Sequence, residues 1–241
     1  MNANASLLLP LMLTAATFAA GCGTAMYQAS AGTRFDADSG REVNDADVSA
    51  AFAASPQITI DSKVAYYTFD EARSQDIEKM LANTPHVSGV YKIPALLVTG
   101  QRHFQETGAY APPVEVSVKK LRLFAARAHA DILLVFDHGY RGGGVNALAA
   151  LNVLLVPMLV TPWLSNETES YAQAYVIDVR NGYLYGDVTT DEKSGDHFVT
   201  IYGKKPADVA DEQWPKLLAD VQSSVGKALA PTGAARAVSP Q

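Results

Sequence analysis

The stretch "DILLVFD", residues 131–137, places five consecutive large apolar residues between two aspartates. Successive side chains of a strand point to opposite faces of its sheet, so an unbroken apolar run predicts a strand that is covered on both faces. In small domains such strands lie at the centre of a sheet that has helices on both sides. The stretch therefore predicts the central strand of an α/β layered domain.

The segments before this strand predict an alternation of strands and helices. Residues 58–69, "ITIDSKVAYYTF", are rich in the β-branched and aromatic residues that favour strands. Residues 70–85 predict a short helix with Ser74 as its N-terminal cap and Ile77, Met80 and Leu81 on its apolar face. Residues 86–98 predict extended chain, and residues 112–130 a second amphipathic helix that ends just before the central strand.

The segments after the central strand predict a hairpin and a final helix. Residues 170–192 form two arms of strand-forming residues around Asn181-Gly182, a pair that favours tight hairpin turns. Residues 211–230 are amphipathic and end the folded part. Together the elements predict one α/β (mixed α+β) layered domain over residues 57–230, with a mixed β-sheet flanked by helices and a disordered tail at 231–241. The apolar stripe of the final helix consists of Trp214, Leu217, Leu218, Val221, Val225, Ala228 and Leu229.

The composition is that of a globular protein. The 241 residues are 48% hydrophobic and 18% charged, and the formal net charge is −6. A nucleic-acid partner requires clustered Lys and Arg, and the densest basic group, Lys119 to Arg127, has the spacing of a solvated helix face. We therefore expect no nucleic-acid partner.

The first 33 residues contain no charged side chain. Within them, Leu7 to Ala20 is an apolar run that is short for a membrane span and fits the core of a secretory signal. The run ends in Ala19-Ala20-Gly21-Cys22, and Cys22 is the only cysteine of the chain. An unpaired thiol is unusual in an exported protein, so a modification of Cys22 is expected.

Small residues followed directly by cysteine resemble the lipobox of bacterial lipoproteins. This resemblance implies that residues 1–21 are a signal peptide, that the Cys22 sulfur receives diacylglycerol and that the new amine is acylated with a fatty acid such as palmitate. Two or three acyl chains anchor a protein to a membrane almost permanently. Gly23 in place of Asp resembles an outer-membrane address, so we expect the inner leaflet of the outer membrane. Residues 22–56 then predict a flexible tether that is rich in small and polar residues.

Two stretches of the domain resemble uncharacterised bacterial envelope lipoproteins with the α/β module of curli-secretion-type lipoproteins. They are "FAARAHADILLVFDHG", residues 124–139, and "YAQAYVIDVRNGYLYGDV", residues 171–188. The resemblance covers roughly residues 60–230 and implies the fold and the periplasmic compartment. Its motifs are structural, so it carries no catalytic residue to this chain.

The stretch "VNALAALNVLLVPMLVTPWL", residues 145–164, contains no charge. Three interpretations are open: a buried core or hairpin segment, an apolar loop that touches a membrane or partner, and a membrane span. Two prolines, two asparagines and an acidic following flank argue against the span. The preceding "HGYRGGG", residues 138–144, predicts a mobile hinge; an anion-binding nest of amides beside Arg141 and a simple turn are the alternatives.

The search for catalytic chemistry yields one weak candidate. Asp137 and His138 end the central strand, where α/β folds place functional groups, but adjacent strand residues point to opposite faces. The acidic residues from Asp187 to Asp196 predict a solvated loop. No metal or cofactor is expected, because none of the five histidines has a zinc-type partner spacing and nucleotide-binding motifs are missing. These histidines are His86, His103, His129, His138 and His197.

The sequence therefore favours a non-enzymatic, lipid-anchored envelope protein. It would face the periplasm as an interaction or assembly module, with the membrane as one partner through Cys22 and an unidentified envelope protein or a second copy as another. The first alternative is a hydrolase or ligand-binding enzyme with its site near Asp137, His138 and Arg141. The second is a subunit of an oligomeric membrane pore.

Overall fold

A computed structural model of the chain describes residues 25–28, 33–36, 45–58, 61–99, 114–145, 162, 164–200 and 202–230. The expected signal peptide, Cys22, nearly all of the apolar stretch 145–164 and the tail 231–241 lie outside the described residues. No helix in the described ranges has the length and apolar character needed to cross a bilayer.

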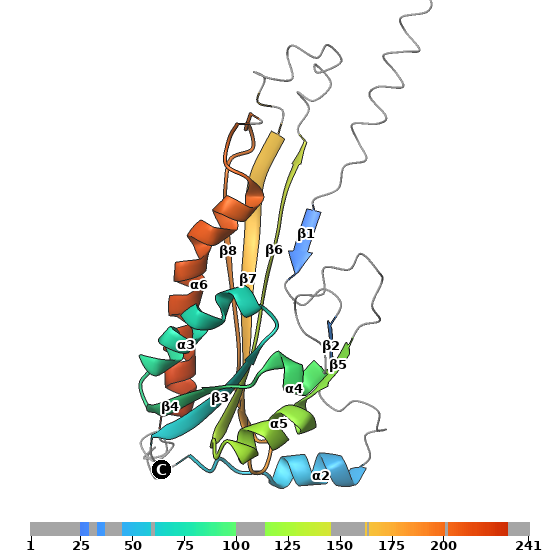
Figure 1. The fold of residues 1–241 in the computed structure, drawn as a ribbon, viewed down its shortest axis with the longest axis vertical. Coiled ribbons are helices and arrows are strands. Elements are labelled where there is room, and N and C mark those ends of the chain that lie inside the picture. The colour runs from blue at the N-terminus through green and yellow to red at the C-terminus, as the bar shows by residue number, and fades with distance from the viewer. Residues whose placement is uncertain are drawn as a thin grey trace, which may run out of the picture. The chain divides into compact units, whose positions relative to one another are not determined.

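The order of elements follows the predicted alternation of strands and helices (Figure 1). The strands β3, β6, β7 and β8 and the helices α3, α5 and α6 match the predicted elements. In full, the elements are β1 (Ala25–Gln28), β2 (Thr33–Asp36), α2 (Asp45–Ala53), β3 (Ser62–Thr68), the 3₁₀ turn η1 (Glu71–Arg73), α3 (Ser74–Ala82), β4 (Val87–Lys92), α4 (Ala95–Thr99), β5 (Val114–Ser117), α5 (Val118–Arg127), β6 (Ile132–Val145), β7 (Leu164–Asp178), β8 (Leu184–Ser194) and α6 (Pro206–Leu229).

The main sheet has the strand order β4-β3-β6-β7-β8, and β1 also pairs with β6. Strand β3 pairs in parallel with both β4 and β6. The amide of Val179, just after β7, donates to the carbonyl of Asp131, just before β6, so these two strands run in opposite directions. Strands β7 and β8 are neighbours joined by residues 179–183, a link that only an antiparallel pair allows. The sheet is mixed and the fold is α/β, as predicted.

The central strand is covered on both faces, as the run "DILLVFD" predicts. Ile132 to Phe136 are each at most 1% exposed. On one face, Leu133 and Val135 join Tyr67 of β3 and Leu121 and Ala125 of α5 in one hydrophobic cluster. Burial of both faces fixes the register, because a slip by one residue would exchange the two sets of side chains.

Helix α3 begins differently from the prediction. Ile77, Met80 and Leu81 are buried as expected, but Ser74 is not the cap. Asp70 instead caps the preceding η1 turn by accepting the amide of Ala72 at 3.1 Å. Ser74 Oγ accepts a hydrogen bond from Lys92 Nζ at 3.0 Å. An aspartate four residues earlier therefore starts the helical segment and leaves Ser74 for a contact with β4.

Helix α6 confirms the predicted apolar stripe, since Trp214, Leu217, Val221, Val225 and Leu229 are each at most 4% exposed. The predicted helix over residues 112–130 is shorter than expected. Its first part is strand β5, and Ser117 caps α5 by accepting the amide of Lys120 at 3.4 Å.

The segment 22–56, expected to be a flexible tether, contains regular structure where it is described. Strand β1 pairs with β6, and β2 pairs in parallel with β5 from Thr33↔Val114 to Asp36↔Ser117. Helix α2 follows, with no buried residue. Short polar strands of this kind gain their structure from pairing with another strand, which composition alone does not reveal.

The glycine-rich stretch 138–144, expected to be a mobile hinge, continues strand β6 to Val145. Gly143 has a φ of +78°, a backbone conformation that favours glycine. The stretch is therefore paired strand that needs glycine for local geometry.

The chain folds into two compact units. The first includes residues 140–170 and 191–215, together with β1, and the second includes 29–139, 171–190 and 216–230. Strands β6, β7 and β8 and helix α6 contribute residues to both.

Candidate functional site

The predicted catalytic alternative consists of Asp137, His138 and Arg141. The structure places these three side chains in different surroundings. His138 is 3% exposed, and its Nδ1 lies 3.3 Å from Asp70 Oδ2. Asp137 acts electrostatically on Tyr175, which packs against the cluster formed by Leu133 and Val135. Arg141 binds Glu169. The expectation that Asp137 and His138 point to opposite faces agrees with these contacts.

The His138–Asp70 pair is part of the fold's interior. Asp70 also caps η1, and its amide donates to Thr68 Oγ1 at 3.0 Å. Burial alone would raise the pKa of Asp70, but the hydrogen bond and charge of His138, with contributions from Arg73, lower it below its ordinary value. A substrate cannot reach an imidazole that is 3% exposed. The pair therefore resembles a stabilising contact more than a catalytic dyad.

The lowered pKa of Asp70 predicts a loss of stability in acid. The unfolded chain binds a proton at Asp70 near its ordinary pKa of about 4, whereas the folded chain binds it only at lower pH. Between these two values the unfolded state holds more protons, so the free energy of unfolding falls as the pH falls below about 4. Urea unfolding at several pH values measures this slope.

Asp70→Asn is the matched variant, because it keeps an oxygen for the Ala72 amide and has no proton to bind in this range. The variant is expected to be less stable than the parent near pH 6 and to lose less stability between pH 4 and pH 2. An equal loss in both proteins would show that Asp70 does not carry the acid sensitivity.

A polar groove of about 270 Å³ lies beside Arg141 in the first unit. Arg141 Nε and Nη2 both donate to Glu169 Oε2, at 2.9 and 2.6 Å. The guanidinium and carboxylate side chains are 61% and 35% exposed, so this pair is an ordinary surface ion pair of small energetic value. The groove is lined by Arg141, Gly142, Gly143, Ser165, Glu167, Thr168, Glu169 and Lys193.

The start of β7 carries a buried polar ladder that sequence reasoning missed. Asn166, Thr168 and Ser170 are each at most 3% exposed. Gln213 of α6 donates to the carbonyl of Thr168 at 2.9 Å and is hydrogen-bonded to the Ser170 hydroxyl. Polar residues at 166, 168 and 170 alternate with Ser165, Glu167 and Glu169, so no apolar alternation marks the buried face of this strand. The signal missed was Gln213 within the otherwise apolar face of α6.

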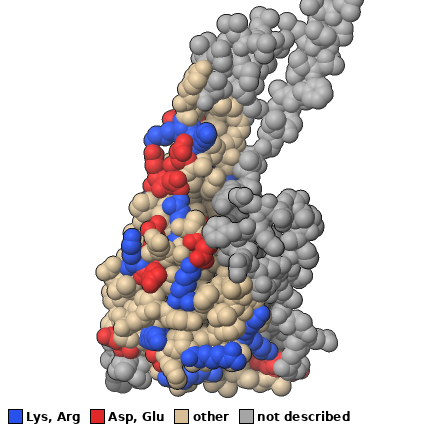
Figure 2. All heavy atoms as spheres, viewed as in Figure 1, with Lys and Arg blue, Asp and Glu red and all other residues tan. Residues whose placement is uncertain are grey.

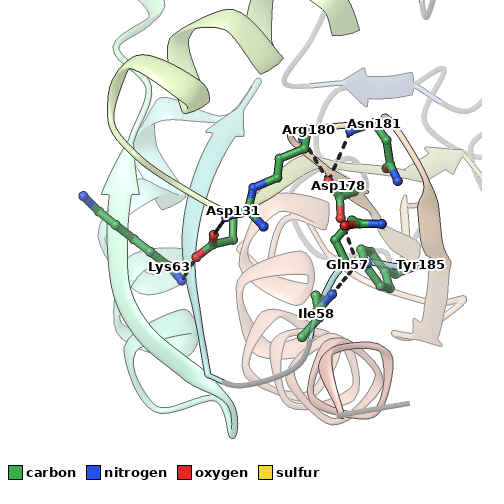
Figure 3. A network of polar contacts seen from close by, with 8 residues as sticks. All are labelled: Gln57, Ile58, Lys63, Asp131, Asp178, Arg180, Asn181 and Tyr185. Carbon is green, nitrogen blue, oxygen red and sulfur yellow. Dashed lines mark hydrogen bonds and ion pairs between the residues drawn. The ribbon is translucent and has the colours of Figure 1, made fainter. Parts of the chain in front are cut away.

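A hydrogen-bond network surrounds the β7–β8 turn (Figure 3). Asp178, which is 2% exposed, accepts the amide of Arg180 at 2.8 Å, the amide of Asn181 at 3.3 Å and the hydroxyl of Tyr185 at 2.9 Å. We call it the hairpin network; it consists of Gln57, Ile58, Lys63, Asp131, Asp178, Arg180, Asn181 and Tyr185.

The hairpin network holds the backbone of residues 55–58. The Tyr185 hydroxyl accepts the amides of Gln57 and Ile58 at 2.8 and 3.1 Å. Asn181 Nδ2 donates to the carbonyl of Ser55 at 2.7 Å. Burial is the main cause that raises the pKa of Tyr185, so the hydroxyl keeps the proton that it donates to Asp178. The segment that leads from α2 into the domain is thus fixed by the hairpin.

Asp131 connects the network to β3. Its Oδ2 accepts the amide of Lys63 at 3.1 Å, and its Oδ1 accepts Arg180 Nη2 at 2.9 Å (Figure 3). A cavity of about 150 Å³ lies here, lined by Gln57, Ile58, Asp61, Ser62, Asp131, Asp178 and Arg180. The carboxylates of Asp131 and Asp178 accept hydrogen bonds from backbone amides, so their role is to hold the backbone in place.

The structure described contains no group of three or more His, Cys, Asp or Glu side chains placed to hold a metal ion. His86 lies 3.3 Å from Asp61, His197 lies 3.7 Å from Glu167, and His103 falls outside the described residues. The expected acidic loop is in part strand, because Asp187, Asp191 and Glu192 belong to β8.

The basic residues of α5 are partly engaged with the chain itself. Arg122 donates to the carbonyls of Val179 and Arg180, and Lys120 Nζ to the carbonyl of Val98. Arg127 lies over the ring of Phe124, 5.7 Å from its centroid. On the face shown in Figure 2, basic side chains gather along the lower edge and are interspersed with acidic ones above it. This face does not present the continuous basic stripe that nucleic acids require.

The protein is thus an α/β domain with a mixed sheet. The β7–β8 hairpin holds residues 55–58, the segment through which the chain enters this domain. No protein-family model matches the chain, and no curated protein matches it.

Among solved structures, the chain is similar to the PelC dodecamer from Paraburkholderia phytofirmans, with 16% identity, 70% of this chain and 94% of that chain covered, and a TM-score of 0.35. A single-substitution variant of that dodecamer gives 17%, the same coverage and a TM-score of 0.32. The nucleoside-triphosphatase (dITP/XTP pyrophosphatase) from Mycobacterium abscessus gives 14% identity, 68% and 96% coverage and a TM-score of 0.28. At these TM-scores the likenesses assign no function to this chain.

Proposed function

We propose that this chain is a lipid-anchored protein of the bacterial cell envelope whose α/β domain acts as a non-enzymatic interaction or assembly module. The acyl chains on Cys22 hold it in a membrane, by our proposal the inner leaflet of the outer membrane, and the domain faces the periplasm. Its protein partner is an envelope protein or a second copy of this chain.

The observation that carries the proposal is the position of the single cysteine. Cys22 follows an uncharged, largely apolar run and small residues, where a signal peptidase requires small side chains and only a thiol can form the thioether. The alternative enzyme site near Asp137, His138 and Arg141 gains no support, because His138 is buried against Asp70 and Arg141 pairs with Glu169.

For the apolar stretch 145–164 we propose a buried core or hairpin segment packed in the domain. It follows the end of β6 and leads into β7. An apolar loop that touches a membrane or a partner, and a membrane span, are the alternatives to this assignment.

Intact mass and membrane fractionation test the anchor. The natural chain is expected to lose residues 1–21, gain the mass of its lipid and acyl groups and fractionate with membranes. Cys22→Ala is expected to lack the acyl mass and to leave the membrane fraction, because the thioether cannot form. Ser30→Ala, a neighbouring substitution that leaves the lipobox unchanged, is the control and should behave as the natural chain does.

A chain that stays in the membrane without acyl mass, in both the natural protein and Cys22→Ala, would contradict the proposal. The apolar segments 7–20 or 145–164 would then have to anchor the protein.

A further inference from the structure

We propose that Phe198 and Tyr202 contact the headgroup layer of the membrane that holds the acyl chains. The proposal rests on the proposed lipid anchor at Cys22 and names the surface of the domain that meets the bilayer.

The anchor and the domain are close in the chain. Strand β1 begins at Ala25, three residues after Cys22, and pairs with β6. Three residues of fully extended chain span at most about 11 Å. A lipidated Cys22 therefore holds β1 near the bilayer surface, whereas a flexible tether over residues 22–56 would have let the domain move far from it.

The start of β1 is directed toward the end of β6. The two strands point in opposite directions (Figure 1), so Ala25 lies on the side where β6 ends at Val145. The beginning of β7 is beside this end, because a Cβ at Gly143 would lie 3.6 Å from the carbonyl oxygen of Ser165. The end of β6 and the beginning of β7 thus lie at the end of this unit from which β1 starts.

Phe198 and Tyr202 belong to the same end. Leu164, the first residue of β7, forms an antiparallel bridge with Val199, with hydrogen bonds of 2.9 and 2.8 Å between their backbones. Asn166 fixes the flanking chain on both sides: its Oδ1 accepts the amide of Asp196 at 2.6 Å, and its Nδ2 donates to the carbonyl of Lys204 at 3.0 Å. Residues 196–200 and 202–204 are therefore fixed against the start of β7.

The two aromatic side chains are unusually exposed. Phe198 is 59% exposed and Tyr202 is 77% exposed, and they are the large apolar side chains of this unit that stand out from its described surface. Tyrosine favours the boundary between lipid and water, where its ring meets apolar surface and its hydroxyl stays hydrated, and phenylalanine adds an apolar ring that enters this layer. A bilayer held within reach of β1 supplies that boundary.

The charged side chains near Phe198 and Tyr202 include two acid–base pairs. Lys204 pairs with Glu212, and His197 lies 3.7 Å from Glu167. Acidic groups are in excess here, because Lys204 also lies near Asp196 and Asp208, so the acyl anchor and the two aromatic rings, not charge, hold this end at the bilayer. The partner of this surface in our proposal is therefore the lipid bilayer.

Fluorescent probes on single cysteines test the contact. Because acylation consumes the only natural thiol, a cysteine introduced by Phe198→Cys or Tyr202→Cys is the one thiol that a dye can label. Leu184→Cys is the matched control, since Leu184 is 50% exposed and belongs to the other unit. Each acylated, labelled protein is placed in vesicles of phosphatidylethanolamine and phosphatidylglycerol, with and without bromine on the acyl chains.

The probes at positions 198 and 202 are expected to emit at shorter wavelength and to lose most of their emission in brominated vesicles, while the probe at 184 keeps its emission. Acyl mass with no bromine quenching at 198 and 202 would overturn the contact alone. Shorter-wavelength emission without quenching would overturn it in favour of a second copy, and equal quenching at all three positions would overturn it as non-specific. Lack of acyl mass on Cys22 would overturn the proposed function and the contact together.

Discussion

Replacing Asp178 with Ala is expected to lower the free energy of unfolding by about 3–4 kcal/mol, because removal of a buried charged acceptor leaves its donors without a partner. The carboxylate accepts two backbone amides and the Tyr185 hydroxyl, and it is 2% exposed. Water cannot easily replace it there. Tyr185 in turn accepts the amides of Gln57 and Ile58, so the loss is expected to extend to the segment that enters the domain.

Urea unfolding followed by circular dichroism measures this change, with Cys22→Ala in every sample so that acylation does not affect the comparison. Asp187→Ala is the matched control, because Asp187 lies in the next strand, is exposed and accepts only a long bond of 3.4 Å from Gln173. It is expected to change the free energy by less than about 0.5 kcal/mol. Equal effects of the two substitutions would show that the hairpin network does not stabilise the fold.

Tyr185→Phe separates the turn from the segment it holds. This variant removes the hydroxyl but leaves the two amide contacts of Asp178 in place. If the network acts as a unit, the double variant loses less than the sum of the two single variants, because both remove the same Asp178–Tyr185 bond. Additive losses would show that the turn and residues 57–58 are stabilised independently.

The main elements could be predicted because each has its own periodicity. The apolar run of β6 indicates two covered faces, the spacing of Leu217, Val221 and Val225 indicates a helix, and Asn181-Gly182 indicates a turn. Gly182 has a φ of +77°, which explains why glycine is required there. The turn is wider than predicted, because residues 179–183 separate the strands and the Gly182 amide donates to the carbonyl of Asp178.

The hairpin network could not be predicted, because its contacts join distant parts of the chain. Gln57 and Tyr185 are 128 residues apart, and neither belongs to a motif that announces a partner. The sequence did place Asp178 and the glycine turn together, but it gave no sign that an aspartate at the end of a strand is buried. The contact of His138 could not be predicted for a related reason: its partner is Asp70, 68 residues away.

The glycine-rich end of β6 provides the second large expected effect. Gly142→Ala is expected to lower the free energy of unfolding by about 2–3 kcal/mol, because overpacking forces the neighbours to move. The new Cβ would lie 2.6 Å from the carbonyl oxygen of Glu167, 2.6 Å from Thr168 Oγ1 and 2.8 Å from Thr168 Cα. Two of these atoms are backbone, and the hydroxyl is held by its bond to the carbonyl of Asn166 at 2.8 Å.

Gly144→Ala distinguishes close packing from the hinge that the sequence predicts. A Cβ at Gly144 would meet nothing within 4 Å, so alanine there is expected to leave stability unchanged or raise it by up to about 1 kcal/mol. If this stretch were a hinge, alanine at position 142 or at position 144 would restrict its backbone, and the two variants would change the free energy of unfolding alike. If the glycines instead allow β6 to approach β7, only Gly142→Ala is destabilised in urea unfolding, because only its Cβ occupies space that Glu167 and Thr168 already fill.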